Sequence, residues 1–173
     1  MFKIKIILYI SIFLFVNSFS ASANIAYINF DFLLNNSKAG KNIESEIKKL
    51  QKKQITEFKN KEDNLKKNED KLLSKKNLLE KKAYILEVEE FKKKVVIYNK
   101  YKNDKITSLN KRRTKSINMF MKEITPILTE YVTKNNISIL LEKKNIVIGK
   151  SNLDITKTIL VLLDEKIDKI NID

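Results

Sequence analysis

The stretch that decides the fold is FKNKEDNLKKNEDKLLSKKNLLEKKAYIL, residues 58–86. Its apolar residues recur every seven positions, at Phe58, Leu65, Leu72, Leu79 and Leu86, and charged residues and asparagines fill most of the gaps. A seven-residue repeat keeps a narrow apolar stripe on one face of a helix, as in coiled coils. The stretch therefore predicts a long, solvent-exposed helix that packs along a single face.

Helical character extends over residues 41–125, which contain no proline, glycine or cysteine. A second apolar stripe follows the first with spacings of three and four. Its members are Phe91, Val95, Tyr98, Ile106, Leu109, Ile117, Phe120, Ile124, Ile127 and Tyr131. Two such stripes predict an antiparallel helical hairpin with arms of roughly 65 Å each, at 1.5 Å per residue. One unbroken helix of about 90 residues is the alternative interpretation.

We expect the tip of this hairpin near residues 83–90, because Glu87, Glu89 and Glu90 favour the start of a new helix. Polar residues occupy many of the expected seam positions, which predicts flexible arms of modest stability. Pro126 lies inside the second stripe, where it removes a backbone hydrogen bond, so we expect a kink near Thr125.

Outside the arm, residues 24–40 and 127–173 predict a small association body of sheet and helix. Strands are expected at residues 24–30, 137–141 and 146–148, the last two joined as a hairpin, and Asp154 is expected to open a closing helix. A body this small has open sheet edges and a marginal core, so we expect it to form a homo-oligomer. Six residues are expected in its core and interface: Ile25, Tyr27, Ile28, Ile139, Leu141 and Ile148.

Residues 1–23 have the pattern of a secretory signal peptide. Lys3 and Lys5 precede an apolar run, and Ala21-Ser22-Ala23 has the small side chains of a cleavage site. The run is short for a membrane span, so an uncleaved anchor is the weaker alternative. We expect cleavage after Ala23 and export to the periplasm.

Composition argues against enzyme chemistry. The chain has no cysteine or histidine and only two glycines, so a Ser/His/Asp triad, a thiolate metal site and a glycine-rich phosphate loop cannot be written. We therefore expect no enzyme activity, no catalytic or metal-binding residue and no cofactor. The net charge of +14 instead favours acidic partners. Most of it lies in the arm, since residues 41–125 hold 25 Lys and Arg against 13 Asp and Glu.

Particular segments at both ends of the chain resemble the Skp/OmpH family of periplasmic chaperones. At the start these are Ile25-Ala-Tyr-Ile-Asn-Phe-Asp31 and Asn36-Ser-Lys-Ala-Gly-Lys41. Towards the end they are Pro126-Ile-Leu128, the Leu-Glu-Lys-Lys that closes residues 137–144, and Asp154-Ile-Thr156. The resemblance implies a trimer whose helical hairpins enclose a cavity and hold unfolded outer-membrane β-barrel proteins without ATP.

If the chain is such a chaperone, we expect client-facing side chains along the arms. The candidates are Lys92, Lys93, Lys94, Arg112, Arg113, Phe58, Phe91, Tyr98 and Tyr101. Two other classes of function remain open: a structural coiled-coil protein of the envelope, and a binder of anionic surfaces or nucleic acid. An anionic lipid surface is a partner that the charge permits. Nucleic acid is not expected, because export would carry the chain away from it.

Overall fold

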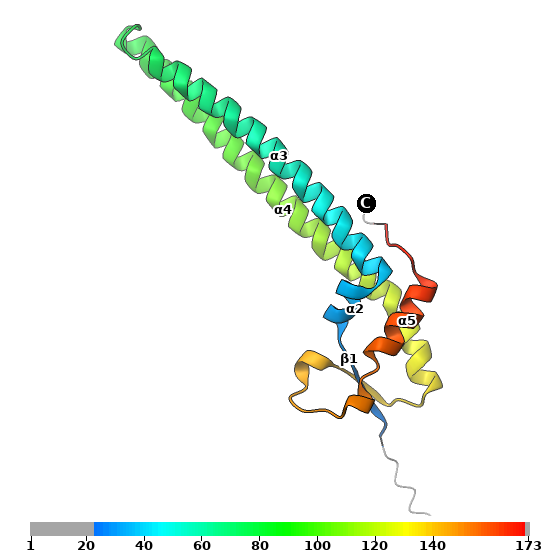
Figure 1. Cartoon of the computed structure of the whole chain (residues 1–173). Coiled ribbons are helices and arrows are strands. Elements are labelled where there is room, and N and C mark those ends of the chain that lie inside the picture. Colours follow the sequence, from blue (N-terminus) through cyan, green and yellow to red (C-terminus); the bar gives the residue numbers. More distant parts are fainter. Residues whose placement is uncertain (1–22, 172–173) are drawn as a thin grey trace, which may run out of the picture.

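The computed structural model describes residues 23–171, and its dominant feature is a long helical hairpin that rises from a small body (Figure 1). The order of elements is β1 (Ile25–Ile28), α2 (Phe30–Asn36), α3 (Lys38–Ser74), α4 (Lys81–Lys134), β2 (Ile139–Glu142), the 3₁₀ turns η1 (Lys143–Asn145) and η2 (Ser151–Leu153), and α5 (Thr156–Lys166). The expected fold class, a helical hairpin on a small sheet-plus-helix body, is confirmed. The expected signal peptide at residues 1–23 lies outside the described residues except for Ala23.

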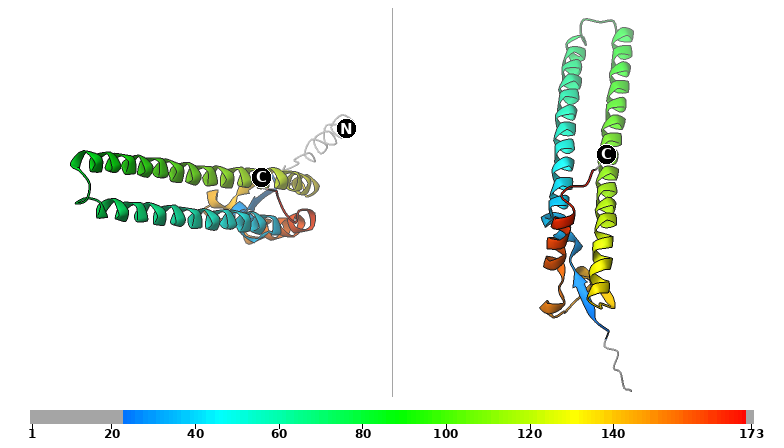
Figure 2. Two further views of the ribbon diagram at one scale, coloured as in Figure 1. Left: turned by 90° about the horizontal axis from the view of Figure 1, so that it is seen from above. Right: turned by 90° about the vertical axis from the view of Figure 1, so that its right-hand side faces the viewer.

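α3 and α4 form the two arms and run side by side in all three views (Figure 2). α3 has 37 residues and α4 has 54, which correspond to roughly 55 and 80 Å of helix. The single unbroken rod is excluded, because the chain reverses direction between Ser74 and Lys81. The expected tip near residues 83–90 was placed too late, since those residues already belong to the first turns of α4.

α4 continues through Pro126 as helix as far as Lys134. Pro126 has no N–H to donate, and the hydroxyls of Thr125 and Thr129 bond to the carbonyls of Met121 and Thr125 around it. The helix ends where Asn136 adopts a left-handed conformation with φ of 51°, which asparagine tolerates better than most residues. The arm helix therefore crosses the expected boundary between arm and body at residue 126.

The sheet of the body has two strands, which pair in parallel, with Ile25 opposite Ile139 and Ile28 opposite Glu142. The expected third strand at residues 146–148 is wrong, as is the hairpin that should join it to residues 137–141. Instead, η1 follows β2 directly, and Val147 is 98% exposed. A strand needs a partner for its backbone groups, and within residues 23–171 nothing pairs with this segment.

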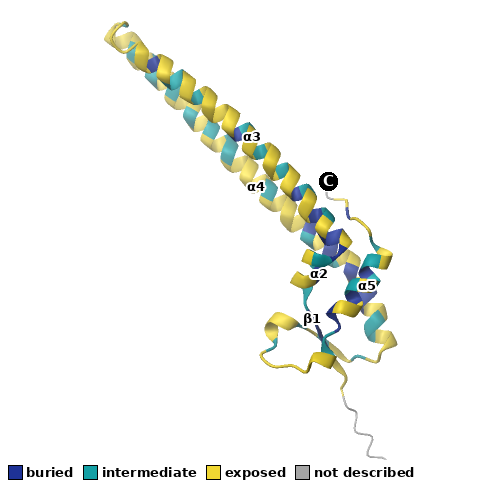
Figure 3. Ribbon diagram, viewed as in Figure 1, coloured by how far each residue is buried: buried dark blue, intermediate teal, exposed yellow. Residues whose placement is uncertain are grey.

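The hydrophobic core lies where α2, α5, β1 and the near ends of both arms meet, and burial falls away along the arms (Figure 3). Its largest fully buried apolar side chains are Ile28, Leu33, Phe120, Ile124, Ile159 and Leu163. The closing helix α5 begins at Thr156 with Ile155 as its N-cap, two residues later than expected, and Asp154 accepts a hydrogen bond from the Thr156 amide at 3.0 Å. The body is thus built from both ends of the chain and fixes the root of each arm.

Candidate functional site

The arms change character along their length. Near the body, Ile43 and Ile47 of α3 are buried with Phe120 and Ile124 of α4. Farther out, only Phe58 and Leu72 of the apolar residues on α3 are buried, and Ile55 is exposed. The outer parts of the arms therefore have little apolar packing to hold them together.

Polar side chains connect the two helices about halfway along α3. The Glu62 carboxylate accepts a hydrogen bond from the Tyr98 hydroxyl at 2.5 Å and another from the Lys102 ammonium at 2.7 Å. One turn closer to the body, the Glu57 carboxylate accepts a hydrogen bond from the Tyr101 hydroxyl. We call Glu57, Phe58, Glu62, Tyr98, Tyr101 and Lys102 the mid-arm clasp.

Aromatic contacts complete the mid-arm clasp. The rings of Phe58 and Tyr101 meet edge to face, with centroids 6.3 Å apart and an angle of 84° between their planes. The ammonium groups of Lys61 and Lys105 lie 4.7 and 5.4 Å from the centroid of the Tyr101 ring. Tyr101 is thus held by a carboxylate, a ring and two cations at once.

These contacts shift the ionisation of the groups involved. The hydrogen bond to Glu57 is the main cause that raises the pKa of Tyr101 to about 12, and burial adds to it. The hydrogen bond from Lys102, followed by that from Tyr98, lowers the pKa of Glu62 below its usual value. The carboxylates of the mid-arm clasp are therefore charged, and its tyrosines are neutral, at ordinary pH.

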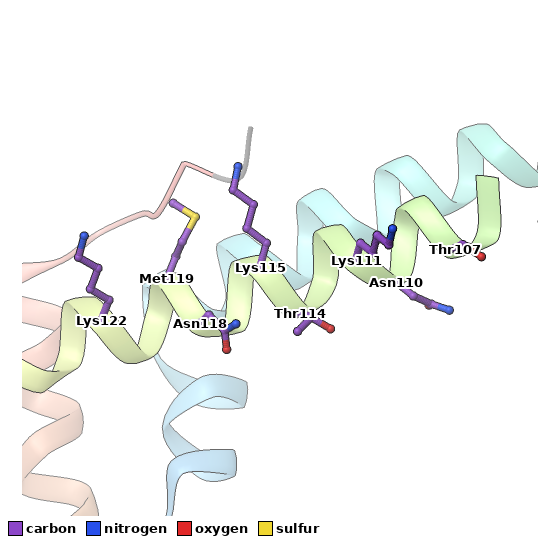
Figure 4. A pocket seen from close by; sticks show the side chains of 8 residues that line it. All are labelled: Thr107, Asn110, Lys111, Thr114, Lys115, Asn118, Met119 and Lys122. Atoms are coloured by element: carbon purple, nitrogen blue, oxygen red, sulfur yellow. The ribbon is translucent and has the colours of Figure 1, made fainter. Parts of the chain in front are cut away.

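α4 carries a large excess of positive charge from Lys92 down to the root of the arm. Between Lys92 and Lys122 there are 11 lysines and arginines, and Asp104 is the one acidic residue. A shallow groove on this helix has three lysines and no carboxylate in its lining, and Figure 4 shows its side chains. They are Thr107, Asn110, Lys111, Thr114, Lys115, Asn118, Met119 and Lys122. Such a face can attract acidic groups along its whole length.

The structure divides the predicted client-facing residues into two groups. Lys92, Lys93, Lys94, Arg112 and Arg113 are exposed on α4, and Lys93 forms an ion pair with Glu90 at 2.8 Å. Of the predicted aromatic residues, Phe58, Tyr98 and Tyr101 belong to the mid-arm clasp, and Phe91 is half-buried. Phe58 is 9% exposed, so its ring is covered within the hairpin.

The six residues predicted for the core and interface of the body also divide. Tyr27 and Ile28 are buried in the single chain. Ile25, Ile139, Leu141 and Ile148 are exposed on it, and Ile148 is 90% exposed. Their contact with a second copy stays a prediction.

Sequence reasoning missed the partners of the predicted aromatic residues. Glu57 and Glu62 lie on α3, and Lys102 lies on α4 beside Tyr98 and Tyr101. The spacing of Tyr98, Tyr101 and Lys102 could have indicated that they lie together, because residues three and four apart share a helix face. Leu73 and Leu78 lie at the true tip, before the expected tip at residues 83–90, and both are exposed.

Within residues 23–171, no group of three or more acidic side chains is arranged to hold a metal ion. Over the same range, no helix is both long and apolar enough to span a bilayer. The arrangement can attract and contact other molecules along a surface.

Comparison with known proteins places the chain in a family. Residues 24–163 match the family described as outer membrane protein (OmpH-like). The chain belongs to the OmpH-like family. No curated protein matches it in sequence. Among solved structures, an OmpH-like protein from Caulobacter crescentus matches with a TM-score of 0.78 at 15% identity, over 87% of this chain and 89% of that one. At that identity the match shows that the OmpH-like fold is shared.

Proposed function

We propose that this chain is an ATP-independent periplasmic holdase. It binds unfolded outer-membrane β-barrel proteins between its basic helical arms and prevents their aggregation. Membership of the OmpH-like family supports a chaperone role in general. The Caulobacter crescentus structure of the same fold is described as a candidate outer membrane chaperone.

One observation carries the proposal: the outer arms expose apolar side chains among a large excess of lysines. Val96 and Ile97 are 67% and 68% exposed and lie between the lysine run at residues 92–94 and Lys100. An unfolded chain offers both apolar segments and carboxylates, so it can form many weak contacts with such a surface. Affinity then comes from the number of contacts, and no single pocket needs to recognise a folded shape.

Electrostatic attraction accelerates the association of clients with the arms in the proposed mechanism. The excess charge of α4 raises the local concentration of acidic segments, and the attraction weakens as salt shortens the Debye length, which is about 8 Å at 0.15 M. The sparse packing of the outer arms lets them adjust to clients of different size. Capture should therefore weaken with rising salt and should not require nucleotide.

We further propose that the body joins several copies, as a homotrimer, so that their arms surround one cavity. β2 forms an edge of the two-stranded sheet, and five apolar side chains are exposed on the sheet and on the loop beyond it. They are Ile25, Ile139, Leu141, Val147 and Ile148. Export after cleavage at Ala23 would deliver this assembly to the periplasm.

The proposal is tested by diluting a urea-unfolded outer-membrane barrel protein into buffer and following light scattering. The chain from Asn24 onward, which contains every described helix and strand, should suppress scattering without ATP and less effectively at high salt. The shaft variant, Lys92→Gln, Lys93→Gln and Lys94→Gln together, should suppress it less. Its control changes Lys48, Lys49 and Lys66 to glutamine, because all three form ion pairs with carboxylates on α3, whereas among the described residues Lys93 alone of the three shaft lysines forms an ion pair, with Glu90.

If an excess of this protein leaves the scattering of the diluted barrel protein unchanged, the holdase proposal is wrong. The structural coiled-coil role would then be the remaining interpretation. Equal loss of suppression in the shaft variant and its control would mean that total charge matters and that the position of the lysines on α4 does not.

A further inference from the structure

A short segment that follows α5 lies against the root of the arms. α5 ends at Lys166, and residues 167–171, which we call the strap, leave the body and run beside the arm helices (Figures 1 and 2). The strap lies beyond residues 24–163, the part of the chain that matches the OmpH-like family. The family match therefore does not describe what this segment does.

One apolar side chain anchors the strap. Ile170 is 6% exposed and belongs to the same hydrophobic core as Ile43 of α3 and Phe120 of α4. Its neighbours Lys169 and Asn171 are exposed. The strap has no regular secondary structure, so the burial of this one side chain gives it a defined resting place on the arms.

The other attachments of the strap are weak. The Lys38 ammonium, at the start of α3, lies 3.0 Å from the Asp168 carboxylate, and both side chains are exposed. Water and salt therefore compete for this ion pair. Among residues 23–171, no backbone hydrogen bond joins residues 168–171 to another part of the chain. The strap can thus leave the arms without breaking any helix or strand.

The strap lies beside the shallow groove of α4 that three lysines line. Figure 4 shows it in pale red, passing the side chains of Lys115, Met119 and Lys122. Met119 packs against the same core cluster that contains Ile170. The groove therefore offers positive charge next to a half-buried apolar side chain, and the strap brings an acidic residue, Asp168, and an apolar one, Ile170, to its edge.

We propose that the strap occupies the root of the arms until an unfolded client displaces it. A client carries the same combination of carboxylates and apolar side chains and offers many more of them, so it competes for this surface. If the strap is docked in about nine-tenths of the molecules, the apparent affinity of the surface for clients falls about tenfold. This competition rests on the proposed holdase function, and it limits how tightly a client is held without ATP.

Displacement can be followed with a spin label, because the chain has no cysteine. A nitroxide on Asn171→Cys, next to Ile170, should have restricted motion in the free protein and become mobile when a urea-diluted barrel protein is added. The same label on Val161→Cys, exposed on α5, should not respond. A strap label that is mobile from the start, or that stays restricted while scattering is suppressed, would overturn the strap inference and leave the holdase proposal standing. Unsuppressed scattering would reject both.

Two variants shift the strap in opposite directions. Ile170→Ser removes its anchor and should strengthen client binding, by up to about tenfold at the occupancy given above. Lys38→Cys with Asp168→Cys, joined by a bis-methanethiosulfonate linker, holds the strap in place and should weaken client binding until a reductant cuts the linker. Val161→Ser is the matched control, because it removes an exposed apolar side chain from α5. Client affinity that is the same in Ile170→Ser and the parent, and unaltered by cutting the linker, would overturn the inference.

Discussion

The hydroxyl of Tyr98 on α4 donates a hydrogen bond to the Glu62 carboxylate on α3 at 2.5 Å, and so connects two helices that share few buried apolar contacts at this level. Lys102 reaches the same carboxylate oxygen at 2.7 Å. These groups are exposed, so water and salt compete for them. The mid-arm clasp therefore connects the two arms through contacts that salt and water weaken.

Replacing Glu62 by glutamine should loosen the arms locally. The amide keeps the shape of the side chain but removes the charge that both donors face, so amide hydrogens on α3 and α4 near the mid-arm clasp should exchange faster. Hydrogen exchange followed by mass spectrometry measures this. Glu44→Gln is the control, because its partner Lys48 lies on the same helix. Equal exchange in both variants would mean that the clasp does not hold the arms.

The pKa values of the residues in the mid-arm clasp set the pH range over which they stabilise arm pairing. The folded pKa values of Glu57 and Glu62 are depressed from 4.5, so their contribution to arm pairing is present above that pH and is lost as pH falls through the folded values. The folded pKa of Tyr101 is raised from 10.0 to about 12, so its contribution is complete below pH 10 and is lost as pH approaches 12. Arm pairing should be insensitive to pH between these limits.

Tyrosinate absorbance during an alkaline titration checks the tyrosine half of this prediction. The Tyr101 phenol should ionise well above its ordinary pKa, and Tyr101→Phe should remove a step near pH 12. If the parent and Tyr101→Phe have the same titration curve above pH 11, the Tyr101 hydroxyl does not donate a hydrogen bond to Glu57 in solution.

Gly40 should not tolerate even a methyl group. A Cβ at this position would lie 1.7 Å from the carbonyl oxygen of Leu34, so the backbone of α2 would have to move away from α3. We expect Gly40→Ala to lower the free energy of unfolding by about 3 kcal/mol, at the upper end of the range for overpacking. Urea unfolding measures the change, and Lys41→Ala, at an exposed neighbouring position, is the control. Equal stability of the two variants would mean that α2 and α3 do not approach this closely.

The body should carry most of the stability of the chain. Phe120 is 1% exposed in the core, and Phe120→Ala should cost about 3–5 kcal/mol. Ile55→Ala, on the exposed face of the outer arm, should change stability by no more than about 0.5 kcal/mol. Thermal or urea unfolding compares the two, and similar losses would indicate that the arms contribute as much to folding as the body does.

The hairpin could be predicted from the sequence because apolar periodicity records which face of a helix is covered. Of the seven-residue stripe, Phe58 and Leu72 are buried, Leu65 and Leu79 are half-buried, and Leu86 is exposed. The prediction that the tip lies near residues 83–90 was wrong for a physical reason. Among residues 23–171, only Asn136 of the non-glycine residues has a positive φ, so the turn after Ser74 needs no glycine and leaves no such signal.

The body was harder to predict because its two paired strands are far apart in the sequence. β1 and β2 are separated by the whole hairpin, and their parallel register has no local turn to reveal it. α2 was missed although its signal was present. Asn29 caps it by accepting a hydrogen bond from the Phe32 amide at 2.9 Å, and Asp31 lies in its first turn. The pairing of Tyr98 and Tyr101 with carboxylates on the other arm depended on the register, which the stripes alone do not fix.

The mass of the complex that the protein forms with a client tests the central claim most directly. Native mass spectrometry of the chain from Asn24 onward, mixed with a urea-diluted outer-membrane barrel protein, should find one client bound to a fixed number of copies, three under the proposed trimer. Finding only free single chains, or a client that stays unbound while it aggregates, would contradict the account.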